Sequence, residues 1–374
     1  MPSSSIREFI QRAALELGFD LAGVAPAGPL RVLEAFPEWI AEGRHGEMHY
    51  LAARNEAGEL RRAALENVAP WARSVVVLAV NYNTAQPYST ECGDHYPDND
   101  CRGWISRYAW GQRDYHTVLL PKLRLLEARL VEFVRAAGGE PPRTWCYVDT
   151  GPVAERALAQ ASGIGWIGKN TCLINEGIGS WLFLGVILTS LAIEPGLPAA
   201  DRCGTCTRCL DACPTRALTV PYQMDASRCI SYLTIEKRGA IPEELREGVG
   251  RNLYGCDICQ DVCPWNREAP VTKLQEFSPR TQLVNPSLTW ISGMKSQEYL
   301  DIFRVSTVKR TKLSGLRRNA SVAMGNSGNL DFVPELRRMA DDPDETVAAH
   351  ARWALLQLER RRKESRHAEE SESG

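Results

Sequence analysis

The sequence predicts an α+β fold made of a mixed domain, a cysteine-rich module and a C-terminal helical domain. Three observations support this prediction. Helical and strand patterns alternate over residues 1–195. Eight of the twelve cysteines fall in one 61-residue stretch, 203–263. After residue 270, apolar residues recur at the spacing of short helices. A run rich in proline and glycine ends the first part, and the predicted domains are 1–195, 196–270 and 271–374.

The first domain contains three apolar segments that are expected to be buried strands, at residues 74–80, 145–148 and 181–191. Residues 121–137 carry apolar side chains at helical spacing and end at a glycine pair, which is typical of a helix. None of the apolar segments is long enough to cross a bilayer.

Asp149 follows a predicted strand at its carboxyl end, where α/β proteins place reactive groups. Local sequence alone favours another role, with Asp149 or Thr150 as the N-cap of a helix that contains Pro152. A carboxyl group buried beside a large cofactor would instead have a raised pKa and could donate a proton near neutrality. Both interpretations remain open at this point.

Residues 163–172 contain glycines that allow close approach of the backbone to a planar or anionic group. They are not predicted to form a P-loop, because Asn170 occupies the position of the required Ser or Thr and no clear strand precedes them. Cys172 is expected to be a small buried residue rather than a nucleophile.

The clustered cysteines have the spacing of a two-cluster ferredoxin, in which the cysteine before proline reaches across to the other cluster. Leu253 stands where the first cysteine of the second run is expected, and we assign that vacancy to Cys229. The predicted ligands are Cys203, Cys206, Cys209 and Cys263 for one 4Fe–4S cluster, and Cys213, Cys229, Cys256 and Cys259 for the other. Zinc sites and disulfides fit less well, because zinc has no need of the Cys-Pro ends and no secretory signal is recognisable.

The C-terminal part shows short paired helices that look like a HEAT-type repeat, and its charged end, 359–374, is expected to fray. Before the first of these helices, a basic strip contains no acid and six Lys or Arg, namely Arg304, Lys309, Arg310, Lys312, Arg317 and Arg318. The strip could follow a phosphate backbone or be a solvated helix face. A net charge of −2 gives no global reason to bind nucleic acid.

Together these motifs resemble the epoxyqueuosine reductase family. The matching segments span almost the whole chain and are 106–116, 148–150, 165–170, the eight cysteines, 255–260 and 317–320. The resemblance implies a nitroreductase/reductive-dehalogenase-like catalytic domain, a ferredoxin-like module with two 4Fe–4S clusters and a HEAT-like domain. It also implies a cobalamin-dependent oxidoreductase that reduces epoxyqueuosine to queuosine at the tRNA wobble position, the last step of queuosine biosynthesis.

The resemblance also implies site residues, with Asp149 as the proton donor. The implied cobalamin contacts are Arg61, Ser106, Asp149, Lys169, Asn170, Ser231, Cys256, Asp257, Ile258 and Cys259. Arg238 and the basic strip would contact RNA. Asp114-x-His116 begins like the corrinoid motif whose histidine replaces the lower cobalt ligand, but Leu119 occupies the glycine position of that motif. We therefore expect base-off cobalamin without an axial ligand from the protein.

The expected partners are an external electron donor and tRNAs with a GUN anticodon, which carry tyrosine, histidine, asparagine or aspartate. Reduced thiolates and the lack of a recognisable targeting segment indicate a cytoplasmic protein without membrane contact, and we expect a monomer. One alternative is a corrinoid and iron–sulfur reductase of a small, for example halogenated, organic substrate, for which basic helices would be unnecessary. The other is a plain electron carrier, for which the large first domain would be unnecessary.

Overall fold

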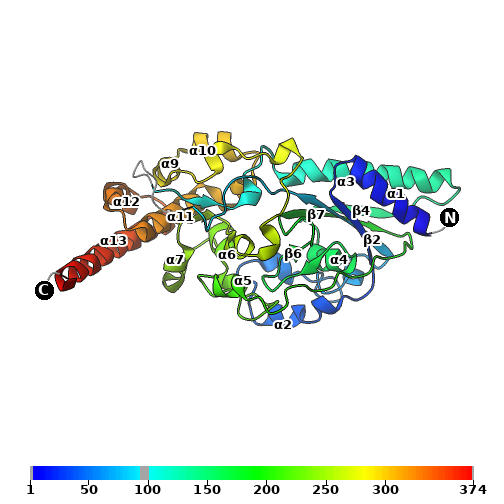
Figure 1. The fold of residues 1–374 in the computed structure, drawn as a ribbon, viewed down its shortest axis with the longest axis horizontal. Coiled ribbons are helices and arrows are strands. Elements are labelled where there is room, and N and C mark those ends of the chain that lie inside the picture. The colour runs from blue at the N-terminus through cyan, green and yellow to red at the C-terminus, as the bar shows by residue number, and fades with distance from the viewer. Residues whose placement is uncertain (1–2, 93–100, 373–374) are drawn as a thin grey trace.

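The computed structural model describes residues 3–92 and 101–372. An antiparallel sheet lies toward one end of the elongated molecule and the C-terminal helices lie toward the other, with the cysteine-rich segments between them (Figure 1). Within the described ranges, no helix combines the length and the apolar character needed to cross a membrane.

The sheet has four strands in the order β1-β2-β7-β4, and all neighbouring strands are antiparallel. Its strands are β1 (Leu21–Pro26), β2 (Ser74–Asn81), β4 (Thr144–Tyr147) and β7 (Leu182–Thr189). Every residue of β2 is buried, because its alternate side chains enter the apolar cores on the two faces of the sheet. Burial on both faces explains why this strand is a continuous apolar run. The three strands predicted from sequence are confirmed.

Helices cover both faces of the sheet. On one face lie α1 (Ser3–Glu16) and α3 (Tyr115–Ala136), which touch through stacked Phe9 and Phe133 rings. On the other face lies α4 (Glu155–Ala161). The predicted helix over 121–137 is the larger part of α3, which begins earlier because the Asp114 side chain caps its first turn.

Short elements fill the middle of the molecule. They are α2 (Phe36–Ala41), β3 (Trp104–Ile105), β5 (Trp166–Ile167), β6 (Leu173–Ile174), α5 (Arg208–Asp211), α6 (Ile230–Ile235), α7 (Glu243–Val249), β8 (Asn252–Tyr254) and α8 (Ile258–Asp261). Strand β3 pairs with β8 in parallel, and β5 pairs with β6 as a hairpin. The first of these pairs joins the mixed domain to the cysteine-rich segment.

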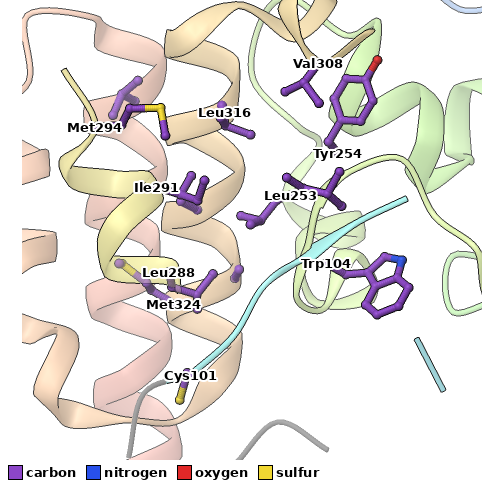
Figure 2. Close-up of a cluster of buried hydrophobic side chains, with 14 of the residues drawn as sticks. Cys101, Trp104, Leu253, Tyr254, Leu288, Ile291, Met294, Val308, Leu316 and Met324 are labelled. Carbon is purple, nitrogen blue, oxygen red and sulfur yellow. The ribbon is translucent and has the colours of Figure 1, made fainter. Parts of the chain in front are cut away.

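The C-terminal helices are α9 (Leu288–Gly293), α10 (Ser296–Phe303), α11 (Lys312–Ser327), α12 (Val333–Ala340) and α13 (Glu345–Glu372). Helix α11 packs against α13 and α9, and its apolar face enters a core that also contains Trp104 and Tyr254 (Figure 2). Leu253 lies in this core and is fully buried. This position therefore packs as a hydrophobic residue, and the three predicted domains share one core across both predicted boundaries.

The charged end of the chain differs from its prediction. Helix α13 continues to Glu372, whereas we expected residues 359–374 to fray. Ion pairs one helical turn apart, Lys363 with Glu359 and Arg360 with Glu364, stabilise this exposed helix. Residues 373 and 374 lie outside the described part of the chain.

Candidate active site

Seven of the eight clustered cysteines lie on two similar turns, and the eighth, Cys229, directly precedes α6. The first turn contains α5 and the second contains α8, and these two short helices pack against each other. The backbone N–H of Cys206 donates to the carbonyl of Cys203 over 3.1 Å, so the two-residue spacer closes a tight turn. This arrangement brings both cysteine runs to one region between the sheet and the C-terminal helices.

Electrostatic interactions sort the cysteines into two groups. Burial, together with the nearby Cys203 thiolate, raises the pKa of both Cys209 and Cys263 to about 11. Burial also raises the pKa of Cys229 and Cys256, with contributions from Cys213 in both cases. These groups match the two ligand sets predicted from spacing. Thiols whose charge is disfavoured by burial and by each other are suited to a positively charged iron centre, which stabilises their thiolates.

The two groups differ in their access to solvent. Exposed residues, among them Thr205 and Arg208, alternate with the cysteines of the first turn. The second turn is more enclosed, and Cys229 and Cys256 contact the small apolar core around α6 and α7. The first group is therefore the one closer to the protein surface.

The turn between β5 and β6 contacts both cysteine turns. The Lys169 ammonium donates to the carbonyls of Gly204 (2.6 Å) and Cys206 (2.9 Å), and the Asn170 amide donates to the carbonyl of Cys259 (3.2 Å). Their predicted contact with cobalamin stays a prediction. Both are buried and directed to the backbone of the cysteine turns. The hairpin also confirms that this glycine-rich segment is not a P-loop.

Ser106 and Asp257, two other predicted cobalamin contacts, are buried against each other. The Asp257 carboxylate accepts hydrogen bonds from the Ser106 hydroxyl, the Trp104 indole (2.9 Å) and the Arg107 backbone (2.7 Å). The side chains of Ser106 and Asp257 are 4% and 1% exposed. Their hydrogen bonds fix the second cysteine turn to the 104–107 segment, and their contact with cobalamin stays a prediction.

Three further predicted cobalamin contacts, Arg61, Ser231 and Ile258, lie on different segments of the chain. Ser231 hydrogen-bonds to Cys229 and opposes the rise in that thiol's pKa that burial causes. Arg61 is exposed and lies near Tyr147, close to the segment that contains Asp149. Ile258 begins α8 and is partly buried. Their roles in cofactor binding remain predictions.

Asp149 lies in a strained turn after β4 and is not a helix cap. Its φ angle is +57°, and α4 begins at Glu155 with no side chain capping it, so the favoured N-cap interpretation is wrong. The Tyr115 hydroxyl donates to Asp149 Oδ2 over 2.8 Å. His116 Nε2 lies 3.8 Å from the same oxygen, and His116 Nδ1 lies 2.7 Å from Asp114 Oδ1. Backbone strain of this kind is typical of functional sites.

The proton of this network resides on His116. The neighbouring His116 imidazolium lowers the pKa of Asp149. Burial disfavours the charged imidazole, but hydrogen bonds to Asp114 and Asp149 outweigh it and raise the pKa of His116 to about 9. The raised pKa expected for a carboxyl group buried beside a large cofactor stays a prediction, because Asp149 is exposed here and a cation faces it.

Two further residues hold the Asp149 turn, and the sequence did not single them out. The Glu155 carboxyl accepts the Asp149 N–H over 2.7 Å, and burial together with the Asp149 charge raises the pKa of Glu155 to about 8. Arg62 donates to the carbonyls of Tyr50 (2.9 Å) and Gly151 (2.7 Å). Arg62 therefore fixes this turn. The sequence instead indicated its neighbour Arg61, as a cobalamin contact. In the sequence, the His116 network could have been recognised from the acidic and aromatic residues that stand next to one another at the start of α3.

The first half of the basic strip approaches this site. Lys309 Nζ lies 3.2 Å from Asp114 Oδ2, and Arg310 pairs with Glu236 from the end of α6. Arg238 donates to the Arg310 carbonyl over 2.8 Å. The strip is therefore connected to the Asp149 network through its N-terminal half.

The rest of the strip is mixed in character. Arg304 and Lys312 are exposed, whereas Arg317 is partly buried beside Asp342 at 3.4 Å. Arg318 is 1% exposed and donates to the carbonyls of Leu233, Lys237 and Gly239. The prediction that Arg318 contacts RNA is corrected, because its guanidinium is occupied inside the protein.

Comparison with known proteins identifies two matching families. Residues 202–266 match the 4Fe–4S double cluster binding domain, which contains all eight clustered cysteines. Residues 62–150 match epoxyqueuosine reductase QueG, DUF1730. The second match ends just after Asp149.

Similar proteins cover nearly the whole chain. Epoxyqueuosine reductase of Xanthomonas campestris pv. campestris is 37% identical over 93% of this chain and 95% of its own length. The enzyme of Gloeobacter violaceus is 42% identical over 86% and 96%. A crystal structure of epoxyqueuosine reductase with a tRNA-Tyr epoxyqueuosine-modified stem loop has a TM-score of 0.82 and 31% identity, covering 96% of this chain and 91% of the other. In a Bacillus subtilis structure with a TM-score of 0.81 and 30% identity, covering 96% and 91%, the catalytic loop is swung out of the active site.

Proposed function

The chain belongs to the epoxyqueuosine reductase family, and from this membership we propose that it reduces epoxyqueuosine to queuosine at the wobble position of tRNA. It is an oxidoreductase with a 4Fe–4S double cluster binding domain. The observation that carries the proposal is the position of the Asp149 network. This network connects to the cysteine turns on one side and to the basic strip on the other.

The connection to the cysteine turns runs through tyrosines and buried polar residues. Ser106 is bonded to Asp257, and Tyr108 and Tyr254 share a hydrogen bond of 2.9 Å. The Tyr108 ring lies 6.4 Å from the ring of Tyr115, which binds Asp149. Electrons delivered at the second cysteine turn would therefore arrive close to the proton-holding residues.

Removal of an epoxide oxygen as water takes two electrons and two protons and leaves an alkene. A 4Fe–4S cluster transfers one electron at a time, so two clusters in series suit this demand. In the proposed assignment, Cys203, Cys206, Cys209 and Cys263 bind the first cluster, and Cys213, Cys229, Cys256 and Cys259 bind the second. The two groups of mutually interacting thiols support this assignment.

The Asp149 network would supply a proton to the departing oxygen. His116 carries a proton at neutral pH and lies 3.8 Å from Asp149, which accepts a hydrogen bond from Tyr115. The exposed Asp149 carboxylate, with 65% of its side chain accessible, is the member of this network that a substrate can reach. We propose that Asp149 passes the His116 proton to the oxygen as the carbon–oxygen bond breaks.

Cobalamin is the proposed coenzyme, as the family resemblance implies, and it would supply the reducing metal chemistry at the epoxide. His116 would not be free to hold this coenzyme. One imidazole nitrogen is bonded to Asp114 and the other faces Asp149. Arg61, Ser231 and the backbone of residues 256–259 remain the proposed contacts of the coenzyme.

We propose that tRNA binds across the basic strip and Arg238. Arg304, Lys309, Arg310 and Lys312 are exposed and lie on the segment that approaches the active site. Helices α11 to α13 would form the HEAT-like unit that presents them, and exposed cations of this kind bind phosphates. The partners would be tRNAs with a GUN anticodon and an external electron donor, and the enzyme would act as a monomer.

The direct test is anaerobic incubation of the reconstituted protein with cobalamin, a strong reductant and tRNA that contains epoxyqueuosine. The RNA is then digested and its nucleosides are weighed. We expect the modified nucleoside to lose one oxygen atom. An unchanged nucleoside in the presence of intact clusters and bound cobalamin would refute the proposed substrate.

A further inference from the structure

Lys169 is a buried cation beside only one of the two cysteine groups. Its side chain is 9% exposed, and its ammonium donates to the carbonyls of Gly204 and Cys206 within the first cysteine turn. Both hydrogen bonds go to carbonyls rather than to carboxylates, so its charge is not neutralised by them. The same turn places the Asn170 amide and the Cys172 thiol, but no cationic side chain, against Cys259 of the second group.

We propose that Lys169 raises the reduction potential of the first cluster and makes it the entry point for electrons. A reduced cluster carries one more negative charge, which a nearby ammonium stabilises. Water screens this interaction weakly because the ammonium is buried. This inference rests on the proposed ligand assignment, but it does not depend on the identity of the substrate.

The surroundings of the first cluster make Lys169 the dominant fixed charge. Asp201 lies on the outer side, where it accepts the Cys203 N–H over 2.8 Å, but it is exposed to solvent. Arg202 is also exposed and pairs with Glu176 at 3.2 Å. Arg208 lies within the cysteine turn and is exposed. Solvent screens these three charges more than it screens the charge of Lys169.

The position of the first group supports a role as the electron acceptor. Its turn contains exposed residues, so an external donor can approach it, whereas the second group is more enclosed and lies toward the Asp149 network. A cluster that is both accessible and easier to reduce collects electrons from the donor. The second cluster would then pass them to the active site.

The test is a redox titration of the two clusters in the anaerobic protein, followed by electron paramagnetic resonance, without tRNA. Lys169→Gln removes the charge and keeps a hydrogen-bond donor, and Lys169→Arg keeps the charge. Arg208→Gln is the matched control, because it removes an exposed charge from the same turn. Cys203→Ala identifies the signal of the first cluster by removing a proposed ligand.

We expect Lys169→Gln to shift the first cluster's one-electron equilibrium toward the oxidised form at least tenfold, about 59 mV. The second cluster should be unaffected, Lys169→Arg should resemble the wild type, and Arg208→Gln should cause a smaller shift. Equal shifts of both clusters, or an equal effect of Arg208→Gln, would overturn the proposal. Loss of the first cluster in Lys169→Gln would also overturn it, by making Lys169 a structural support. The potentials are measured without tRNA, so a failure to reduce epoxyqueuosine would not change them. The two proposals can therefore be refuted independently.

Discussion

In the proposed mechanism, His116 holds the proton and Asp149 transfers it to the substrate. The imidazole is held by Asp114 on one side and faces Asp149 on the other, which keeps it charged. Tyr115 donates to Asp149 and fixes the position of the carboxylate. A carboxylate next to an imidazolium can take its proton, pass it to the substrate oxygen and return to the ionised form.

This pair predicts a pH profile with an alkaline limb. The pKa of His116 is raised from 6.5 to about 9, so the imidazolium of the folded protein persists through neutrality and is lost as the pH rises through about 9. Turnover should therefore persist through neutrality and fall near pH 9. His116→Asn should lower kcat by about 10²–10⁴-fold and remove that limb. A variant with the wild-type profile would show that another group supplies the proton.

The sequence predicted the position of Asp149 but not its charge state. A carboxylate after a strand is visible in the chain, whereas the cation that faces it comes from the start of α3. The pKa depends on that distance, which spacing along the chain does not give. The contacts of Lys169 could not be predicted for the same reason, because its ammonium binds residues 35 and 37 positions away in the sequence.

At the scale of elements, the start of α11 divides the basic strip between two helices. Residues 307–311 form a short 3-10 helix, and α11 begins at Lys312 with a φ of +61°. The strip is therefore not one helix face. Leu316 and Ala320 enter the shared core, as their spacing predicted, and Arg318 is carried inward with them. The break between the two helices could not be read from a uniform run of basic residues.

Arg318→Met should destabilise the protein, because three backbone carbonyls lose their buried donor. We expect a loss of roughly 3 kcal/mol in the free energy of unfolding. Arg352→Met is the control and should cost less, since its partner Glu345 is 80% exposed and can be hydrated. Chemical denaturation of both variants measures the difference. Equal losses would contradict the structural role assigned to Arg318.

The whole molecule joins its three sequence segments through one core. The β3–β8 pair and the side chains around Leu253 connect the mixed domain, the cysteine-rich segment and α9 and α11 (Figure 2). The sequence indicated the three segments by their composition. The contacts between them are long-range pairings of short strands, which carry too few residues to show a pattern.

The proposed RNA surface predicts a salt effect. Arg304 and Lys312 are exposed, so Arg304→Gln combined with Lys312→Gln should weaken tRNA binding and reduce the slope of log affinity against log salt by about 2. Arg12→Gln, an exposed change on α1 at the other end of the molecule, is the control. Filter binding at several salt concentrations checks this. An unchanged slope in the double variant would exclude these residues as phosphate contacts.

The most direct test of the central proposal is nucleoside mass analysis with Asp149→Asn beside the wild type. The amide keeps the size of the side chain and still accepts from Tyr115, but it cannot carry the proton. We predict that the variant retains its iron, its cobalamin affinity and its tRNA affinity, and that oxygen loss from epoxyqueuosine falls at least about 10²-fold. Oxygen loss near the wild-type rate would contradict the role of Asp149 and place the chemistry elsewhere.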